Sequence, residues 1–149
     1  MSILFINGSP NKNGNTAELA EKLMGGKAYQ TLNLVDYKVY GYGQNFADDQ
    51  FSEIVEAMKA ADTIVIGSPV YWHNMSGMVR NLIDRFYGLV PSGALKGRKF
   101  VFLFQGGAPE VWMFEKAEYT MNRFARMYGM EYVGMATDVR EAEALSEKI

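Results

Sequence analysis

The sequence has 149 residues, a formal net charge of −2 and a hydrophobic fraction of 48%, which suits one globular domain with a full-sized core. It contains no cysteine and one histidine, His73, which excludes disulfides, thiol catalysis, cysteine-held clusters and multi-histidine metal sites. It also lacks a membrane-length apolar run, a basic leader and a basic stripe, so we expect a cytoplasmic protein with no membrane or nucleic-acid partner.

Strand-like and helix-like stretches alternate along the chain. The stretches at 2–7, 63–67 and 99–104 have continuously apolar interiors, as strands buried on both faces do, whereas residues 29–35 alternate, as an edge strand does. In chain order the predicted elements are a strand at 2–7, a helix at 16–27, a strand at 29–35, a helix at 51–61, a strand at 63–67, a helix at 75–87, a strand at 99–104, a helix at 111–128, a strand at 131–137 and a helix at 140–148.

This alternation predicts a single domain over residues 1–149, in which a parallel sheet carries helices on both faces. Five strands in a chain of this length fit a three-layer α/β sandwich with the flavodoxin-like strand order 2-1-3-4-5. That order makes the first and third strands neighbours at the topological switch point, where ligands bind beyond the carboxyl ends of the strands. The loops at residues 8–16 and 68–74 are therefore the predicted binding site.

The loop at residues 8–16, GSPNKNGNT, joins the first strand to the first helix. The free N–H groups and the dipole of a helix N-terminus favour an anion there. The loop lacks the Gly-Lys-Ser/Thr ending of a triphosphate loop and the G-x-G-x-x-G spacing of a dinucleotide loop. We interpret it as a cradle for a terminal phosphate, with a tight turn and helix cap as the alternative. The candidate donors are Ser9, Asn11, Asn13, Asn15 and Thr16, with Lys12 as the nearby cation.

Two further loops have features of a site for a flat ring. Residues 68–74 place large aromatic side chains beyond a strand end, where a planar ligand could stack, although the rings could instead pack on neighbouring helices. His73 alone is interpreted as a packing or hydrogen-bonding residue, although its charge could change near neutral pH. Residues 105–109 permit close backbone approach to a ligand, or form an ordinary turn. The candidates are Pro69, Val70, Tyr71, Trp72, His73, Asn74, Gln105, Gly106 and Gly107.

Two motifs carry a resemblance to a known family: Gly-Ser-Pro-x-x-x-Gly-Asn-Thr at 8–16, and Ser-Pro-Val-Tyr-Trp-x-x-Met-Ser-Gly at 68–77, which continues to an Asp-Arg pair at 84–85. The chain resembles the NAD(P)H-dependent FMN reductases, which are flavodoxin-like flavoproteins. The resemblance implies FMN as cofactor, with its phosphate held by Ser9, Asn11, Asn15 and Thr16, residues 69–74 around the flavin ring and residues 105–107 at its edge. It also implies a homodimer or homotetramer.

Two departures from the family pattern are visible. Relatives often carry arginine at the position of Asn11, and the cysteine cluster of iron–sulfur members is absent. Asp84 and Arg85 belong to the family pattern, but adjacent helical residues do not face one direction, so we interpret them as structural contacts.

The predicted function is an FMN-dependent NAD(P)H oxidoreductase that passes electrons to a quinone, a flavin or a similar small acceptor. Hydride transfer needs no acid or base, so no residue is assigned as catalytic, although His73 or Tyr71 could protonate a reduced acceptor. The alternative is a flavodoxin-like electron carrier, against which the small net charge argues. The choice between NADH and NADPH stays open, as does the role of residues 36–50, which suit an interface, a lid or a surface connection.

Overall fold

The structure is a computed structural model that describes residues 1–107 and 110–149. Residues 108 and 109, which belong to the predicted turn at 105–109, lie outside the described residues. The elements are β1 (Ile3–Asn7), α1 (Asn15–Met24), β2 (Gln30–Asn33), the short 3₁₀ helix η1 (Leu34–Asp36), α2 (Phe51–Ala60), β3 (Thr63–Tyr71), β4 (Asn74–Met75), α3 (Gly77–Phe86), β5 (Lys99–Gln105), α4 (Val111–Met127), β6 (Glu131–Ala136) and α5 (Val139–Ser146).

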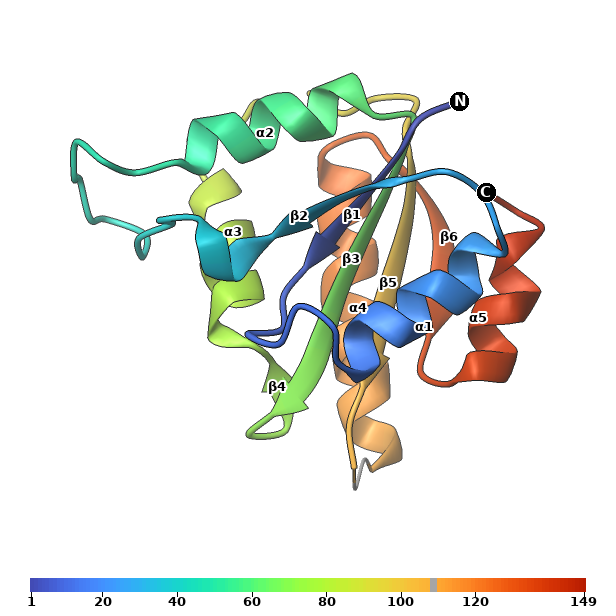
Figure 1. Ribbon diagram of the computed structural model, residues 1–149. Coiled ribbons are helices and arrows are strands. Elements are labelled where there is room, and N and C mark those ends of the chain that lie inside the picture. Colours follow the sequence, from blue (N-terminus) through green and yellow to red (C-terminus); the bar gives the residue numbers. More distant parts are fainter. Residues whose placement is uncertain (108–109) are drawn as a thin grey trace.

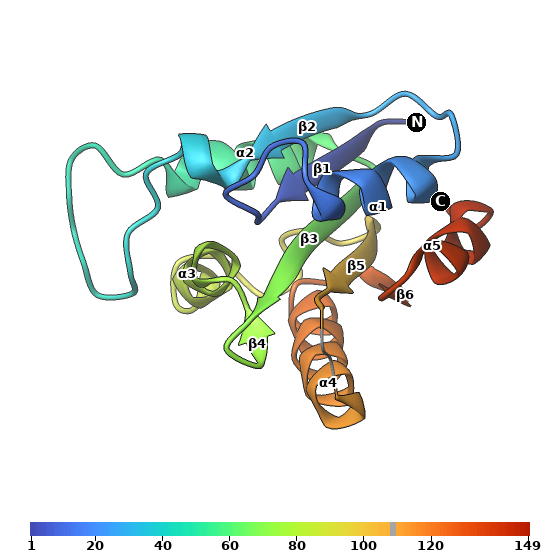
Figure 2. The same ribbon diagram turned by 60° about the horizontal axis from the view of Figure 1, so that its bottom comes forward.

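The five long strands form a parallel sheet in the order β2-β1-β3-β5-β6. Helices α1 and α5 cover one face of the sheet and α2, α3 and α4 cover the other, as Figures 1 and 2 show. This is the predicted three-layer sandwich, and β2 lies at the predicted edge. The predicted order is confirmed when the long strands are numbered one to five.

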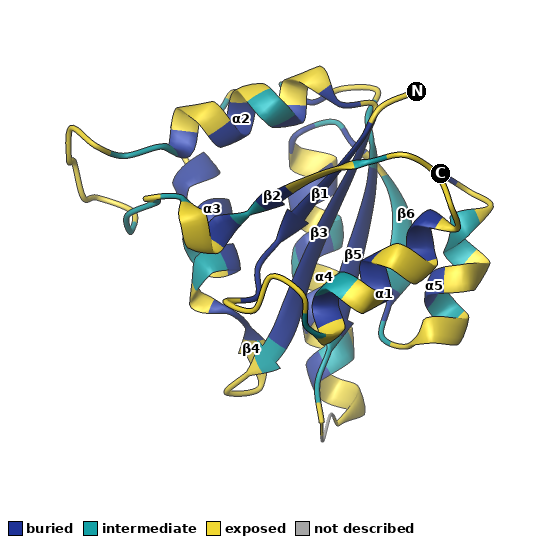
Figure 3. Ribbon diagram, viewed as in Figure 1, coloured by how far each residue is buried: buried dark blue, intermediate teal, exposed yellow. Residues whose placement is uncertain are grey.

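The side chains of the central strands explain why their sequences do not alternate between apolar and polar. In β1, Ile3 and Phe5 pack toward α1 and α5, while Leu4 and Ile6 pack toward α2, α3 and α4. Successive strand residues point to opposite faces, so a strand covered on both faces is apolar throughout. Figure 3 shows this pattern as buried strands between helices whose outer faces are exposed.

The sheet has six strands rather than the five predicted, because the third strand runs past residue 67 and folds back. Val70 pairs with Met75 and Tyr71 pairs with Asn74, which makes β4 an antiparallel partner of β3. The motif predicted as a loop at 68–74 is therefore mostly a short hairpin. None of the helices in the described parts of the chain is long and apolar enough to cross a membrane.

Candidate functional site

A cavity of about 290 Å³ lies at the carboxyl ends of β1, β3 and β5, beside the N-terminus of α1. We call it the strand-end cavity. It joins the three loops that the sequence predicted to meet. Its lining residues are Ser9, Asn11, Gly14, Asn15, Thr16, Pro69, Val70, Tyr71, Gln105, Gly106 and Gly107.

The N-terminus of α1 forms one wall of the strand-end cavity. Gly14 is the N-cap residue, and as a glycine it provides no side-chain hydrogen bond to the first turn of this helix. A Cβ atom at Gly14 would lie 2.8 Å from Nδ2 of Asn11, so glycine lets the Asn11 side chain lie against the helix start. The first-turn N–H groups and the helix dipole are thus available to an anionic ligand.

The loop after β1 is held by its own side chains. The amide of Ser9 donates to Oδ1 of the fully buried Asn7 at 3.0 Å, and Nδ2 of Asn7 donates to Oδ1 of Asn33 at 3.1 Å. The amide of Asn11 donates to Oγ of Ser9 at 3.1 Å. The sequence analysis did not predict a role for Asn7. A polar residue at the end of a buried strand is the signal that could have indicated one. Asn7 fixes the loop that carries the lining residues.

Gln105, at the end of β5, links the loop after β5 to the start of α1. Its Nε2 atom donates to Oγ1 of Thr16 at 3.3 Å, and Thr16 is only 1% exposed. A Cβ atom at Gly67 would lie 2.7 Å from Cγ2 of Thr16, and one at Gly106 would lie 2.7 Å from Cβ of Val70. These close approaches bring the backbone of β3 and of the loop after β5 against the cavity.

Two serines outside the cavity hold the first and second loops together. The hydroxyl of Ser76 donates to the carbonyl oxygen of Gly8 at 2.7 Å and, as the N-cap of α3, accepts from the amide of Val79. The amide of Ser76 donates to Oγ of Ser68 at 2.8 Å. Ser76 is part of the motif at 68–77, but its linking role was not predicted, because it depends on the contact with a loop 68 residues earlier.

None of the residues that line the strand-end cavity is charged. Lys12, the candidate cation of the first loop, instead forms a half-exposed ion pair in which its Nζ atom lies 2.7 Å from Oδ2 of Asp36. In the described residues, no group of three or more acidic or histidine side chains is placed to hold a metal ion. The lining is uncharged and lies beside the N-terminus of α1, and the role of its side chains as phosphate donors stays a prediction.

The hairpin tip that follows Tyr71 lies outside the cavity lining. Trp72 and His73 have positive φ angles of 48° and 62°, a conformation that costs a side-chain-bearing residue about 1–2 kcal/mol. The ring of His73 lies 5.8 Å from that of Trp112, between centroids. The predicted cofactor contacts of Trp72, His73 and Asn74 stay predictions.

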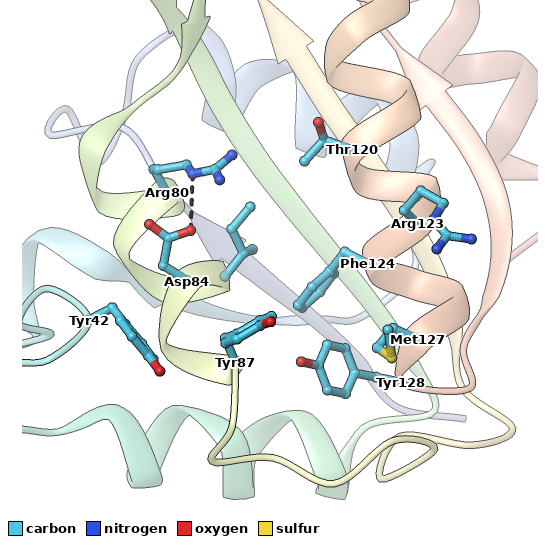
Figure 4. A pocket seen from close by; sticks show the side chains of 10 residues that line it. Tyr42, Arg80, Asp84, Tyr87, Thr120, Arg123, Phe124, Met127 and Tyr128 are labelled. Carbon is cyan, nitrogen blue, oxygen red and sulfur yellow. Dashed lines mark ion pairs between the residues drawn. The ribbon is translucent and has the colours of Figure 1, made fainter.

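A second, larger hollow of about 420 Å³ lies between α3 and α4 (Figure 4). We call it the helix-face hollow. The aromatic rings of Tyr87, Phe124 and Tyr128 converge in it, and burial, together with the neighbouring Tyr87, raises the pKa of Tyr128. Sequence analysis did not predict this hollow. Its lining is Tyr42, Arg80, Ile83, Asp84, Tyr87, Thr120, Arg123, Phe124, Met127 and Tyr128.

The connection that supplies Tyr42 is anchored by an ion pair. The guanidinium of Arg85 donates to both carboxylate oxygens of Asp49 and to the carbonyl of Tyr40, and it lies 4.9 Å above the ring of Phe51. Burial raises the pKa of Asp49, but the hydrogen bonds from Arg85 and from the amides of Phe51 and Tyr40 outweigh it and lower the pKa overall. These contacts of Arg85 hold the connection in place and agree with its interpretation as a structural residue.

Comparison with known proteins shows the family of the chain. The sequence model of the family described as NADPH-dependent FMN reductase matches residues 1–136. The chain belongs to this family. The motifs at 8–16 and 68–77 both lie in the matched region, so the predicted resemblance is confirmed.

Two relatives show how far the sequence similarity extends. An iron–sulfur flavoprotein of Archaeoglobus fulgidus is 39% identical over 99 residues, which is 57% of this chain and 48% of that protein. The FMN reductase (NADPH) of Escherichia coli is 29% identical over 118 residues, 72% of this chain and 57% of that protein. The chain thus spans about half the length of these relatives, and its sequence contains no cysteine to hold an iron–sulfur cluster.

Solved structures support the fold of this family member. The Trp repressor binding protein of Bacillus subtilis superposes with a TM-score of 0.77 at 19% identity, covering 96% of both chains. At that identity the likeness extends to the fold alone. The flavodoxin-like architecture predicted from the alternation of elements is confirmed.

Proposed function

We propose that residues 1–149 form a single FMN-binding domain that catalyses NAD(P)H-dependent reduction of a quinone, a flavin or a similar small acceptor. The observation that carries the proposal is the uncharged cavity at the switch point, where three strand ends and one open helix N-terminus meet. A ligand with a single terminal phosphate and a flat polar ring suits such a site. Family membership supports the same ligand class.

The residues of the cavity fit FMN in two parts. Ser9, Asn11, Asn15 and Thr16 offer neutral donors beside the dipole of α1, which suits a phosphate monoester better than a magnesium-bound triphosphate. We assign the ring to Pro69, Val70 and Tyr71 on one side and to Gln105, Gly106 and Gly107 on the other. The predicted contacts from Trp72, His73 and Asn74 would extend this ring site toward the hairpin tip.

FMN held by these residues would supply a ring that can take a hydride from NAD(P)H and give the electrons to the second substrate. The protein supplies position and surroundings. Pro69 and Val70 give one wall an apolar surface that excludes water, and the Gln105 amide, oriented by Thr16, can hydrogen-bond a heteroatom at the ring edge. The Gly106 backbone lies against Val70, which leaves no room for a side chain between ring site and wall.

Titration with FMN tests the cofactor assignment. The purified protein should bind FMN with a visible flavin spectrum and, once loaded, oxidise NADH or NADPH when a quinone is added. Asn11→Ala and Thr16→Ala should each weaken FMN binding by roughly 10- to 150-fold, since each removes a hydrogen-bond donor to a charged group, worth about 1.5–3 kcal/mol. Asn13→Ala, in the same loop but outside the lining, is the matched control. A protein that takes up no FMN, or equal affinity in all variants, would refute the assignment.

We also propose a homodimer that buries the helix-face hollow. Tyr42, Tyr87 and Met127 line the hollow and are exposed, an unusual grouping of large side chains on the surface of a monomer. Tyr87→Glu combined with Met127→Glu should give a monomer in sedimentation experiments. Val139→Glu, an equally drastic change at an exposed position on α5, should leave the dimer intact. A wild-type monomer at all concentrations would contradict the proposal.

We also propose that the protein is located in the cytoplasm. A cytoplasmic setting suits an enzyme that draws on NAD(P)H, a soluble cofactor of that compartment. Fractionation of cells that express the tagged chain would test it.

A further inference from the structure

The stretch from the end of β1 to the start of α1 contains two Asn-Gly steps, Asn7-Gly8 and Asn13-Gly14, and the sequence has no others. An asparagine that precedes glycine is chemically labile, because glycine has no Cβ atom to keep its backbone nitrogen away from the asparagine side chain. Attack by that nitrogen converts the side-chain amide into a carboxylate through a cyclic imide. The folded structure determines which of the two steps can react.

The step Asn7-Gly8 is held against this reaction. Asn7 is fully buried, its Oδ1 atom accepts from the amide of Ser9 at 3.0 Å, and its Nδ2 atom donates to Oδ1 of Asn33 at 3.1 Å. The attacking atom would be the nitrogen of Gly8, which donates to the carbonyl oxygen of Gly67 at 2.7 Å. Ring closure would break these hydrogen bonds inside the core, where water does not replace them. We therefore expect Asn7 to stay intact in the folded protein.

The step Asn13-Gly14 lacks these restraints. Asn13 is exposed, on the part of the loop that Figure 3 shows between the buried end of β1 and the start of α1. Its backbone amide donates to Oδ1 of Asn11 at 3.3 Å. Among the described residues, neither the side chain of Asn13 nor the N–H of Gly14 takes part in a hydrogen bond. Ring closure at this step therefore breaks no hydrogen bond of either group and displaces no part of the core.

We propose that Asn13 is a site of spontaneous deamidation, which changes the strand-end cavity from a site that accepts an anion into one that repels it. In the first step the nitrogen of Gly14 bonds to Cγ of Asn13, and the bond from Cγ to Nδ2 breaks. The proton lost by the Gly14 nitrogen leaves with Nδ2 as ammonia. Water then opens the cyclic imide at either carbonyl, which gives aspartate or isoaspartate. Water is the co-reactant, and nothing is oxidised or reduced.

The product places a negative charge beside the proposed phosphate cradle. Gly14, the next residue, is the N-cap of α1 and lines the cavity. The lining contains no cation to offset a new carboxylate, and Lys12 is paired with Asp36 at 2.7 Å. The carboxylate of an aspartate has a pKa of about 3.9, so it is ionised at neutral pH and repels a phosphate monoester. This consequence rests on the proposed function, in which the phosphate of FMN lies there.

The aspartate product should not weaken the fold. A negative charge near the N-terminus of a helix interacts favourably with the helix dipole, and Asn13 directly precedes the N-cap of α1. The side chain of Asn13 also gives up no hydrogen bond within the described residues when it is converted. Weaker FMN binding without a loss of stability therefore distinguishes electrostatic repulsion from damage to the loop.

Mass spectrometry tests the modification without any ligand. The full chain is kept folded for days at mildly alkaline pH, which favours attack by the backbone nitrogen. Trypsin cuts after Lys12, so the two Asn-Gly steps lie on separate peptides, and a sample digested at the start corrects for reaction during digestion. The peptide that begins at Asn13 should gain the mass difference between an amide and a carboxyl group, and the peptide with Asn7 should not. No conversion at Asn13, or equal conversion at both steps, would overturn the proposal.

Titration with FMN tests the consequence. Ion exchange separates the deamidated chain, which has an additional negative charge, from the intact chain. The deamidated fraction and freshly prepared Asn13→Asp should each bind FMN about tenfold more weakly than the intact chain. Asn13→Ala is the matched control, because it has neither the reactive amide nor the charge, and its FMN affinity should be the same before and after incubation. The Tm of Asn13→Asp should equal or exceed that of the wild type.

The outcomes separate this proposal from the proposed function. An intact chain that binds no FMN would refute the flavin assignment, and with it the effect of the modification on FMN, while the mass spectra would still decide the modification itself. Equal FMN affinity in the intact and deamidated fractions would overturn the proposal alone. Weaker FMN binding by Asn13→Asp together with a lower Tm would assign the effect to a damaged loop, which also overturns the proposal.

Discussion

The strand-end cavity and the helix-face hollow are built in opposite ways. The cavity is lined by uncharged residues from three loops, most of them small, and glycines bring its walls together. The hollow is lined by large side chains from α3, α4 and the long connection, including two arginines, an aspartate and three tyrosines. The first is shaped mainly by backbone and the second mainly by side chains.

This difference predicts different partners for the two regions. Backbone held by buried hydrogen bonds, such as those of Asn7 and Ser76, keeps its shape and suits a cofactor that must be held in one position. Long side chains at a surface can reorient, and they cover area at an interface. Changes to one region should therefore leave the function of the other intact.

The largest loss of stability is expected from Arg85→Met. This change should disturb the helix-face hollow and leave the strand-end cavity unchanged. The change leaves the Asp49 carboxylate uncompensated and removes the anchor of the connection that supplies Tyr42. Breaking such a pair costs about 3 kcal/mol. Urea unfolding should show this loss, hydrogen exchange should accelerate in the connection, and dimerisation should weaken, while FMN affinity below the new Tm stays constant.

A matched control for Arg85→Met lies in the same connection. Lys38→Met removes an ion pair with Asp48 at 3.0 Å that is exposed to solvent. Exposed pairs contribute little, so this variant should unfold like the wild type. If both variants lost equal stability, the anchor would not reside in the Arg85–Asp49 pair. If Arg85→Met also lost FMN, the two regions would be coupled.

The same ion pair predicts how stability depends on pH. Hydrogen bonds from Arg85, Phe51 and Tyr40 outweigh burial and lower the pKa of Asp49 in the folded protein. A lowered pKa contributes stability that is present above the unfolded value of about 3.9 and is lost as pH falls through the folded value. The wild type should therefore exceed Asp49→Asn in stability at neutral pH, and the gap should narrow in unfolding curves taken down to about pH 3. A gap independent of pH would contradict this.

Gly67→Ala should destabilise the protein less than Arg85→Met does. It should damage the strand-end cavity and leave the helix-face hollow unchanged. The new Cβ would lie 2.7 Å from Cγ2 of Thr16 and 2.9 Å from Cε2 of Phe5. Overpacking of this kind costs about 1–3 kcal/mol, and displacement of Thr16 should weaken FMN binding about tenfold. Calorimetric titration with FMN and sedimentation would measure both properties.

Gly77→Ala is the control for this substitution. No atom lies within 4 Å of a Cβ at Gly77, which begins α3, so alanine should stabilise the protein slightly through its helix propensity. Unchanged FMN affinity in Gly67→Ala would show that Thr16 is not part of the phosphate site. A lost dimer would show that the cavity and the hollow are not independent.

The same contrast explains which features the sequence could predict. Loops that follow consecutive strands must meet at one edge of a parallel sheet, so Ser9, Thr16, Val70 and Gln105 could be placed together from their order alone. The hollow brings Tyr42 against Tyr87, and no local spacing encodes that contact. The hairpin at 68–75 was missed because its turn lacks glycine or asparagine at the central positions, the usual signal.

The smallest expected effect is the coupling between Arg80 and Asp84 at the rim of the hollow. Nε of Arg80 lies 3.1 Å from Oδ1 of Asp84 one helical turn on, and the two side chains are 50% and 39% exposed. In a monomer such a pair contributes about 0.2–0.5 kcal/mol and is screened by salt. A double-mutant cycle with Arg80→Ala and Asp84→Ala should give this value at protein concentrations where the chain is monomeric. If a second copy covers the hollow, the pair loses solvent, and the coupling should grow and become less sensitive to salt as concentration rises. A coupling that stays small and salt-sensitive in a sedimenting dimer would place the dimer contact elsewhere.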